Sequence, residues 1–146
     1  MDRKEFIKTC CFACIGGSAL SLLFESCASA NYYAQSTSAS NQIILKKSEF
    51  IKIDKDKQTL RKYVLLKSEK YSFPIGVYHL GNERYAALLL QCTHKGCELQ
   101  PQGDYLVCPC HGSEFTNEGV VQNPPAEQNL QNFKTSTDHE NIYIQL

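Results

Sequence analysis

Short apolar runs dominate the chain from residue 42 onward. They cover residues 43–45, 50–53, 63–66, 75–80, 85–90 and 141–146, and they are rich in Ile, Val, Leu and Tyr. Runs of this length and composition are typical of β-strands. The turn residues Gly81-Asn82-Glu83 lie between two of them and predict a hairpin. Since no amphipathic helical pattern of useful length occurs, residues 42–146 are predicted to form an all-β domain.

The first 27 residues have the pattern of a targeting signal. Basic residues at 3, 4 and 8 precede an apolar stretch that runs from Thr9 to Phe24. The sequence Arg3-Lys4-Glu5-Phe6-Ile7-Lys8 resembles a twin-arginine export motif with Lys in the second arginine position. An ordinary secretory signal is the alternative. Either route predicts an exported protein, in the periplasm or on the outer face of the cytoplasmic membrane.

The residues after this apolar stretch predict a membrane tether. Leu23-Phe24-Glu25-Ser26-Cys27 resembles a loose bacterial lipoprotein box, which makes Cys27 the candidate for lipidation. A transmembrane anchor is an alternative, although the apolar stretch is short for the ~17–25 residues that a spanning helix needs. Cleavage near Ala28-Ser29-Ala30, which would release a soluble protein, is a third. Residues 28–41 are small and polar and predict a flexible linker.

The charge of the chain excludes one class of partner. Fifteen basic and fifteen acidic residues give a formal net charge of zero at pH 7. Because nucleic-acid binding leaves a basic patch and no basic run is present, we expect no nucleic-acid partner. No combination of side chains resembles a nucleophile with a general acid and base, so we expect no independent enzyme activity.

Two short stretches carry the candidate chemistry. Cys92-Thr93-His94-Lys95-Gly96-Cys97 and Cys108-Pro109-Cys110-His111-Gly112-Ser113 each offer a Cys and a His at metal-ligand spacing, beside a second Cys. Two thiolates and two imidazoles suit a tetrahedral zinc ion. They equally suit a two-iron cluster with cysteines on one iron and histidines on the other.

The two stretches together resemble the Rieske [2Fe-2S] family, whose cluster-binding loops read C-T-H-x-G-C and C-P-C-H-G-S. Every one of these fixed positions matches. The resemblance implies one [2Fe-2S] cluster, with Cys92 and Cys108 on the buried iron and His94 and His111 on the outer one. It also implies a Rieske-type antiparallel β-sandwich or barrel with a small cluster-binding subdomain.

The remaining cysteines fit the same interpretation. The resemblance implies a disulfide between Cys97 and Cys110, which zinc binding would leave unexplained. Of the eight cysteines, three lie in the apolar stretch of the targeting signal, one is Cys27, and four lie in the two motifs. Disulfides persist in oxidising compartments, which agrees with export.

Three further positions bear on the reduction potential. In high-potential Rieske proteins, a Ser at the position of Ser113 donates to a bridging sulfide. A Tyr at the position of Phe115 donates to a cysteine ligand. Since Phe115 has no hydroxyl group, we expect a potential below the highest of the family but above that of disulfide-free relatives. Asn123-Pro124-Pro125-Ala126 resembles the proline-containing loop that covers the cluster, although Asn123 replaces the usual Gly.

The leading functional prediction is an exported, membrane-tethered one-electron carrier with a redox protein as partner. The first alternative is the Rieske subunit of a quinol:cytochrome c oxidoreductase-type complex, in which His94 or His111 would bind quinol. Lys95 and Phe115 count against it, because quinol-oxidising relatives usually have an aliphatic residue at the first position and Tyr at the second. The second alternative is a non-redox, zinc-binding exported module.

Overall fold

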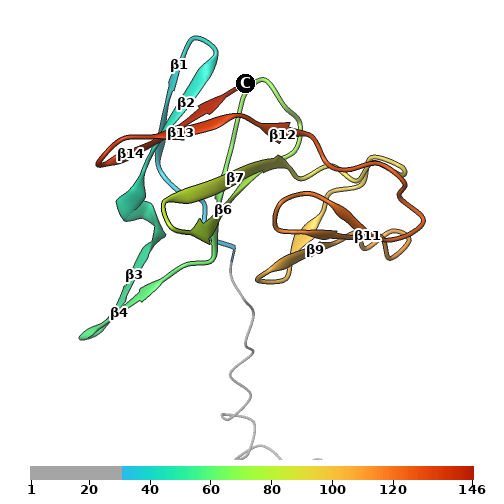
Figure 1. The fold of residues 1–146 in the computed structure, drawn as a ribbon, viewed down its shortest axis with the longest axis horizontal. Helices are drawn as coiled ribbons and strands as arrows, with labels where there is room; N and C mark the ends of the chain where they lie inside the picture. The colour runs from blue at the N-terminus through green and yellow to red at the C-terminus, as the bar shows by residue number, and fades with distance from the viewer. Residues whose placement is uncertain (1–30) are drawn as a thin grey trace, which may run out of the picture. The chain divides into compact units, whose positions relative to one another are not determined.

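The computed structural model describes residues 31–146, which consist mainly of short β-strands and the turns between them (Figure 1). The strands are β1 (Ser36–Ala39), β2 (Gln42–Lys46), β3 (Ile51–Asp54), β4 (Lys57–Leu60), β5 (Tyr63–Leu66), β6 (Ile75–Gly81), β7 (Arg84–Leu89), β8 (Gln100–Pro101), β9 (Tyr105–Val107), β10 (Glu114–Thr116), β11 (Val121–Asn123), β12 (Asn132–Phe133), β13 (Thr135–Thr137) and β14 (Asn141–Gln145), with one 3-10 helix, η3 (Lys47–Phe50). The strands form four-stranded sheets in the orders β1-β2-β14-β13, β12-β7-β6-β5 and β11-β10-β9-β8, and the hairpin β3-β4. All named strand pairs are antiparallel, so the predicted fold class is confirmed.

The sheet of β5, β6, β7 and β12, called the middle sheet below, is buried on both faces. On β5, Val64 and Leu66 belong to one apolar core, while Leu65 between them belongs to another. Successive side chains of a strand point to opposite faces, so a sheet between two cores needs apolar residues in succession. This explains why β5 and β7 read as continuous apolar runs in the sequence.

The two cores join the middle sheet to its neighbours. The first core includes Ile43 of β2 and Ile142 of β14, which come from the β1-β2-β14-β13 sheet. The second core includes Leu106 of β9 and Phe115 of β10, which come from the β11-β10-β9-β8 sheet. The second core also contains Cys92 and Cys108, so two of the four candidate metal ligands are packed within it.

Part of the predicted linker is folded. Residues 36–39, inside the predicted linker 28–41, form β1 and pair with β2 from Ser36 opposite Leu45 to Ala39 opposite Gln42. All four β1 residues are exposed, so backbone hydrogen bonds hold this strand without a buried face. A strand of this kind leaves no apolar pattern, which is why the predicted domain from residue 42 does not include it.

Other boundaries differ in detail. Phe50 ends η3 and is buried, whereas β3 after it is fully exposed, so the predicted strand 50–53 begins one residue later. The predicted hairpin turn at 81–83 joins β6 to β7, and residues 102–104 form the turn that joins β8 to β9. Strands β8 to β11 have only two or three residues each, too few for a sequence pattern. Among residues 31–146, no helix is long and apolar enough to cross a membrane.

Candidate metal centre

The first motif forms a compact loop, residues 92–97, directly after β7. The backbone N–H of Cys92 donates to the carbonyl oxygen of Cys97, and the N–H of Gly96 donates to that of Cys92, both at 2.8 Å. These two bonds close the loop on its first residue. The side chain of Cys92 is 2% exposed and points into the second core.

The second motif, residues 108–113, repeats the same backbone arrangement between β9 and β10. The N–H of Cys108 donates to Ser113 O at 2.8 Å, and the N–H of Gly112 donates to Cys108 O at 3.0 Å. Gly96 and Gly112 occupy the same place in their loops and have φ angles of 74° and 78°. Only glycine adopts this conformation at little cost, which gives the matched Gly of each motif its physical reason.

Two free thiols meet beneath these loops. Cys92 and Cys108 are the free cysteines of the described residues, and both are buried. Burial raises the pKa of the Cys108 thiol, and the Cys92 thiol adds to this effect. The backbone N–H groups of Cys110 and His111 donate to the Cys108 sulfur and act in the opposite direction. Such N–H groups would also stabilise a thiolate ligand.

The two predicted histidine ligands also come together. The imidazole rings of His94 and His111 lie with centroids 4.9 Å apart and planes at 80°. His94 is half-buried, and its Nδ1 is buried with no hydrogen-bond partner in the described part of the chain. His111 is exposed. A buried imidazole nitrogen without a partner is costly, so this atom is suited to bind a metal.

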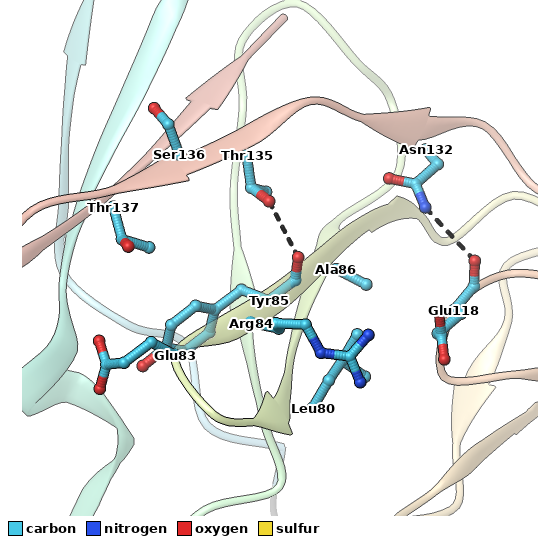
Figure 2. A pocket seen from close by; sticks show the side chains of 10 residues that line it. All are labelled: Leu80, Glu83, Arg84, Tyr85, Ala86, Glu118, Asn132, Thr135, Ser136 and Thr137. Atoms are coloured by element: carbon cyan, nitrogen blue, oxygen red, sulfur yellow. Dashed lines mark hydrogen bonds between the residues drawn. The ribbon is translucent and has the colours of Figure 1, made fainter.

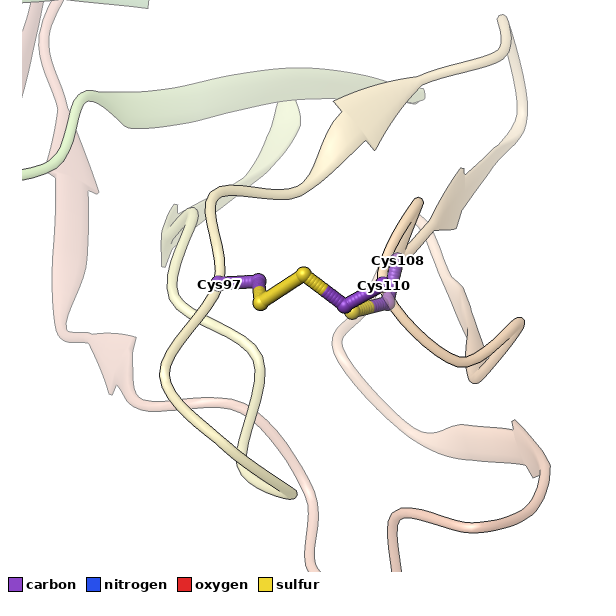
Figure 3. Close-up of side chains that lie close together, drawn as sticks. All are labelled: Cys97, Cys108 and Cys110. Carbon is purple, nitrogen blue, oxygen red and sulfur yellow. A yellow bond between two sulfur atoms is a disulfide. The ribbon is translucent and has the colours of Figure 1, made fainter.

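The structure confirms the disulfide between Cys97 and Cys110, which links the two loops (Figure 3). The Cα atoms of these residues are 6.6 Å apart. The sulfur of Cys108 lies within 4.8 Å of both sulfurs of the bridge. Because two of these three sulfurs are joined to each other, this group is not itself a metal site. Instead, it shows that the bridge lies directly beside a predicted ligand.

The residues expected to cover and tune the centre lie against both loops. Ser113 is fully buried, and its Oγ accepts the N–H of Ala126 at 3.0 Å. The hydroxyl proton of Ser113 therefore remains available for donation. Thr93 Oγ1 donates to the carbonyl oxygen of Gln128 at 2.7 Å. The chain that follows Pro124 is thus hydrogen-bonded to both loops. No sequence pattern indicated the contact of Thr93.

Phe115 is fully buried in the second core, and its replacement by Tyr tests how the centre is tuned. We expect Phe115→Tyr to raise the reduction potential by on the order of 50 mV, because a hydroxyl donor would stabilise the more negative reduced state. The measurement is a redox titration of the purified protein. Phe133→Tyr, in the first core, is the matched control and should leave the potential unchanged. An unshifted potential in Phe115→Tyr would remove the hydrogen-bond argument.

A separate hollow of about 360 Å³ lies between β7 and β13 and contains none of the predicted ligands (Figure 2). Thr135 on one side donates to the backbone oxygen of Tyr85 on the other at 2.9 Å. Glu83 and Arg84 are among the residues that line it.

Cys27, the candidate for lipidation, lies outside the described residues. Lys95 is exposed beside His94.

Comparisons with known proteins agree with this geometry. The sequence model of the Rieske [2Fe-2S] domain matches residues 42–134. A crystal structure of the plasma membrane Rieske protein PetC3 from Synechocystis PCC 6803 is similar, with a TM-score of 0.52 and 31% sequence identity. The match covers 58% of this chain and 87% of that one.

Curated relatives match over a shorter stretch. The chain is 38% identical over 53 residues to the ubiquinol-cytochrome c reductase iron-sulfur subunit of Bradyrhizobium diazoefficiens. It is 33% identical over 55 residues to the cytochrome b6-f complex iron-sulfur subunit of a Synechococcus strain. These matches cover 34% and 36% of this chain and only 30% and 31% of the relatives.

Proposed function

Because the chain belongs to the Rieske [2Fe-2S] domain family, we propose that it is a one-electron carrier of a membrane-associated redox chain. The observation that carries this proposal is the meeting of two buried free thiols and two imidazoles between loops that one disulfide joins. Cys92 and Cys108 would hold one iron, and His94 and His111 the other. When bound, such a cluster takes up and releases one electron.

The residues of the described chain fit this cofactor. Soft thiolates suit the buried iron, and the N–H groups that point at Cys108 would stabilise its sulfur in the ligated form. The buried Nδ1 of His94 would gain the partner that it otherwise lacks. Zinc could use the same four side chains, but the family match supports the iron-sulfur cluster.

Electron exchange with a partner is expected through the histidine edge, because His111 is exposed while both cysteine ligands are buried. The charges of residues 91–131, which include both loops, bear on the partner. They comprise one cation, Lys95, and the carboxylates Glu98, Asp104, Glu114, Glu118 and Glu127, of which Asp104 is paired with Lys62 outside this range. The other described residues carry more cations than carboxylates, so the net charge of zero is unevenly distributed and residues 91–131 are acidic. An acidic surface on these residues favours a redox protein with a basic docking surface.

We place this carrier outside the cytoplasm and tethered to the membrane. The support is the export signal predicted in residues 1–27, with Cys27 as the lipid anchor, and the Cys97–Cys110 disulfide. Disulfides of this kind persist in oxidising compartments such as the periplasm. A tether would keep the exposed His111 close to partners in or on the same membrane.

Quinol oxidation is the second candidate function. The two curated relatives are named as subunits of ubiquinol-cytochrome c reductase and of the cytochrome b6-f complex. In that function His94 or His111 would bind quinol and take up its proton. The exposed Lys95 beside His94 weighs against it, because an apolar docking pocket would have to accommodate the charge.

An electron paramagnetic resonance titration on cells that express the full chain tests the proposal. We expect a rhombic signal with a low average g value, found in the membrane fraction. A signal already induced by ascorbate would favour quinol oxidation, whereas one that needs dithionite would favour the lower-potential carrier. A signal confined to the soluble fraction would contradict the tether. Zinc without any such signal would contradict the redox function.

A further inference from the structure

The covering segment, defined as residues 123–130, is held by the hairpin β10-β11 as well as by the two loops. Leu130 N–H donates to the carbonyl oxygen of Gly119 at 2.9 Å, and Val121 N–H donates to the side chain of Asn129 at 3.0 Å. These bonds fix the far end of the segment to the hairpin. Ala126 and Leu130 are buried in the second core, so the segment is packed as well as hydrogen-bonded.

The start of the segment has a contact of its own. Asn123, the last residue of β11, lies opposite Glu114, the first residue of β10, and its amide donates to the Glu114 carboxylate. The register shifts just beyond this pair, because Phe115 lies opposite Val121 and leaves Gln122 as an extra residue. Such a bulge bends its strand and redirects the side chains that follow it. Asn123 is therefore the point at which the hairpin ends and the covering segment begins.

Glu114 is next in the chain to another residue that contacts the covering segment. It follows Ser113, whose hydroxyl oxygen accepts the N–H of Ala126 in the middle of the covering segment. Two consecutive residues, Ser113 at the end of the second loop and Glu114 at the start of β10, thus hold the segment at its middle and at its start. Pro124 follows Asn123 in the chain and restricts the backbone of Asn123 to extended conformations. A displacement of Asn123 would therefore move the segment as a unit and pull on the Ser113 contact.

We propose that the Glu114 carboxylate and the Asn123 amide form a latch that positions the covering segment over the two metal-binding loops. A hydrogen bond to a carboxylate is stronger than one between neutral groups, which suits it to this task. Glu114 and Asn123 are positioning residues, since they act through Ser113 and the segment. The effect on cluster retention rests on the function proposed above, but the effect on the segment does not.

Hydrogen exchange of the segment measures the latch without reference to any metal. In the full chain, Glu114→Ala and Asn123→Gly are each expected to speed amide exchange of residues 123–130 by about fivefold, the factor that corresponds to one lost hydrogen bond. Glu114→Gln keeps an acceptor for the Asn123 amide and should restore slow exchange. Glu118→Ala is the matched control, because it removes the same charge from the same hairpin without touching the segment.

The combined variant separates a latch from two independent effects. Glu114→Ala/Asn123→Gly should exchange no faster than either single variant, because both remove the same contact. In the cluster-loaded protein, iron should be released to a chelator faster in Glu114→Ala and Asn123→Gly than in the wild-type protein and Glu114→Gln. The combined variant should release it no faster than either single variant. Wild-type exchange in Glu114→Ala, equal rates in Glu114→Ala and Glu114→Gln, or additive effects would each overturn the latch. A chain that carries zinc would instead contradict the redox function, and the exchange result would still decide the latch.

Discussion

Replacing His111 by Asn is expected to abolish the rhombic paramagnetic signal and to leave the purified protein without its normal iron content. His111 and His94 are the two imidazoles that face each other between the loops, and a two-iron cluster of this type needs both. Because His111 is exposed, its loss should leave the fold intact. The measurements are iron analysis, the paramagnetic spectrum and circular dichroism of the same preparation.

His139→Asn supplies the matched control. His139 is also exposed, but it lies in the turn between β13 and β14, away from both loops. This variant should keep the wild-type iron content and spectrum. A wild-type signal in His111→Asn would exclude His111 as a ligand and would leave the four-residue ligand set incomplete.

Removing the disulfide by Cys97→Ser/Cys110→Ser is expected to lower the free energy of unfolding by about 3 kcal/mol. The bridge joins residues 13 positions apart, and closing a loop of that size restricts the unfolded chain. It is also the covalent link between the two loops, so iron release should become faster as well. Urea unfolding of the metal-free proteins measures the stability.

Reduction of the wild-type protein tests the same effect without a substitution. Cys110 is exposed, so a reductant can reach the bridge. Reduced wild-type protein and the double variant should unfold at similar urea concentrations, both below that of the oxidised protein. Equal midpoints for the oxidised and reduced forms would show that packing alone holds the loops together.

The sequence predicted the longer strands well because their apolar residues record burial. The runs 63–66 and 85–90 are apolar throughout, since the middle sheet packs against a core on each face. The exposed strand β1 left no such record and falls inside the predicted linker. The short strands β8 to β11, which support the second loop, were not predicted either, because two or three residues are too few to show the alternation of a strand.

The ligand residues of the centre could be predicted from the sequence, but the contacts that surround them could not. Ligand types and spacing are local properties, so Cys92, His94, Cys108 and His111 could be named from the two motifs. The contact of Thr93 with Gln128, in contrast, joins residues that are far apart in the chain. Nothing in their identities indicates that they meet.

The amino-acid sequence by itself therefore determined the β-strand class, the two motifs and the residue types that suit a [2Fe-2S] cluster. Their arrangement was decided by the tertiary structure. The turn of β8 and β9 brings the second loop back to the first, and packing on the middle sheet fixes the hairpin that carries Glu114 and Asn123. Such contacts depend on strand pairing and core packing over long separations, which a local pattern of residues does not encode.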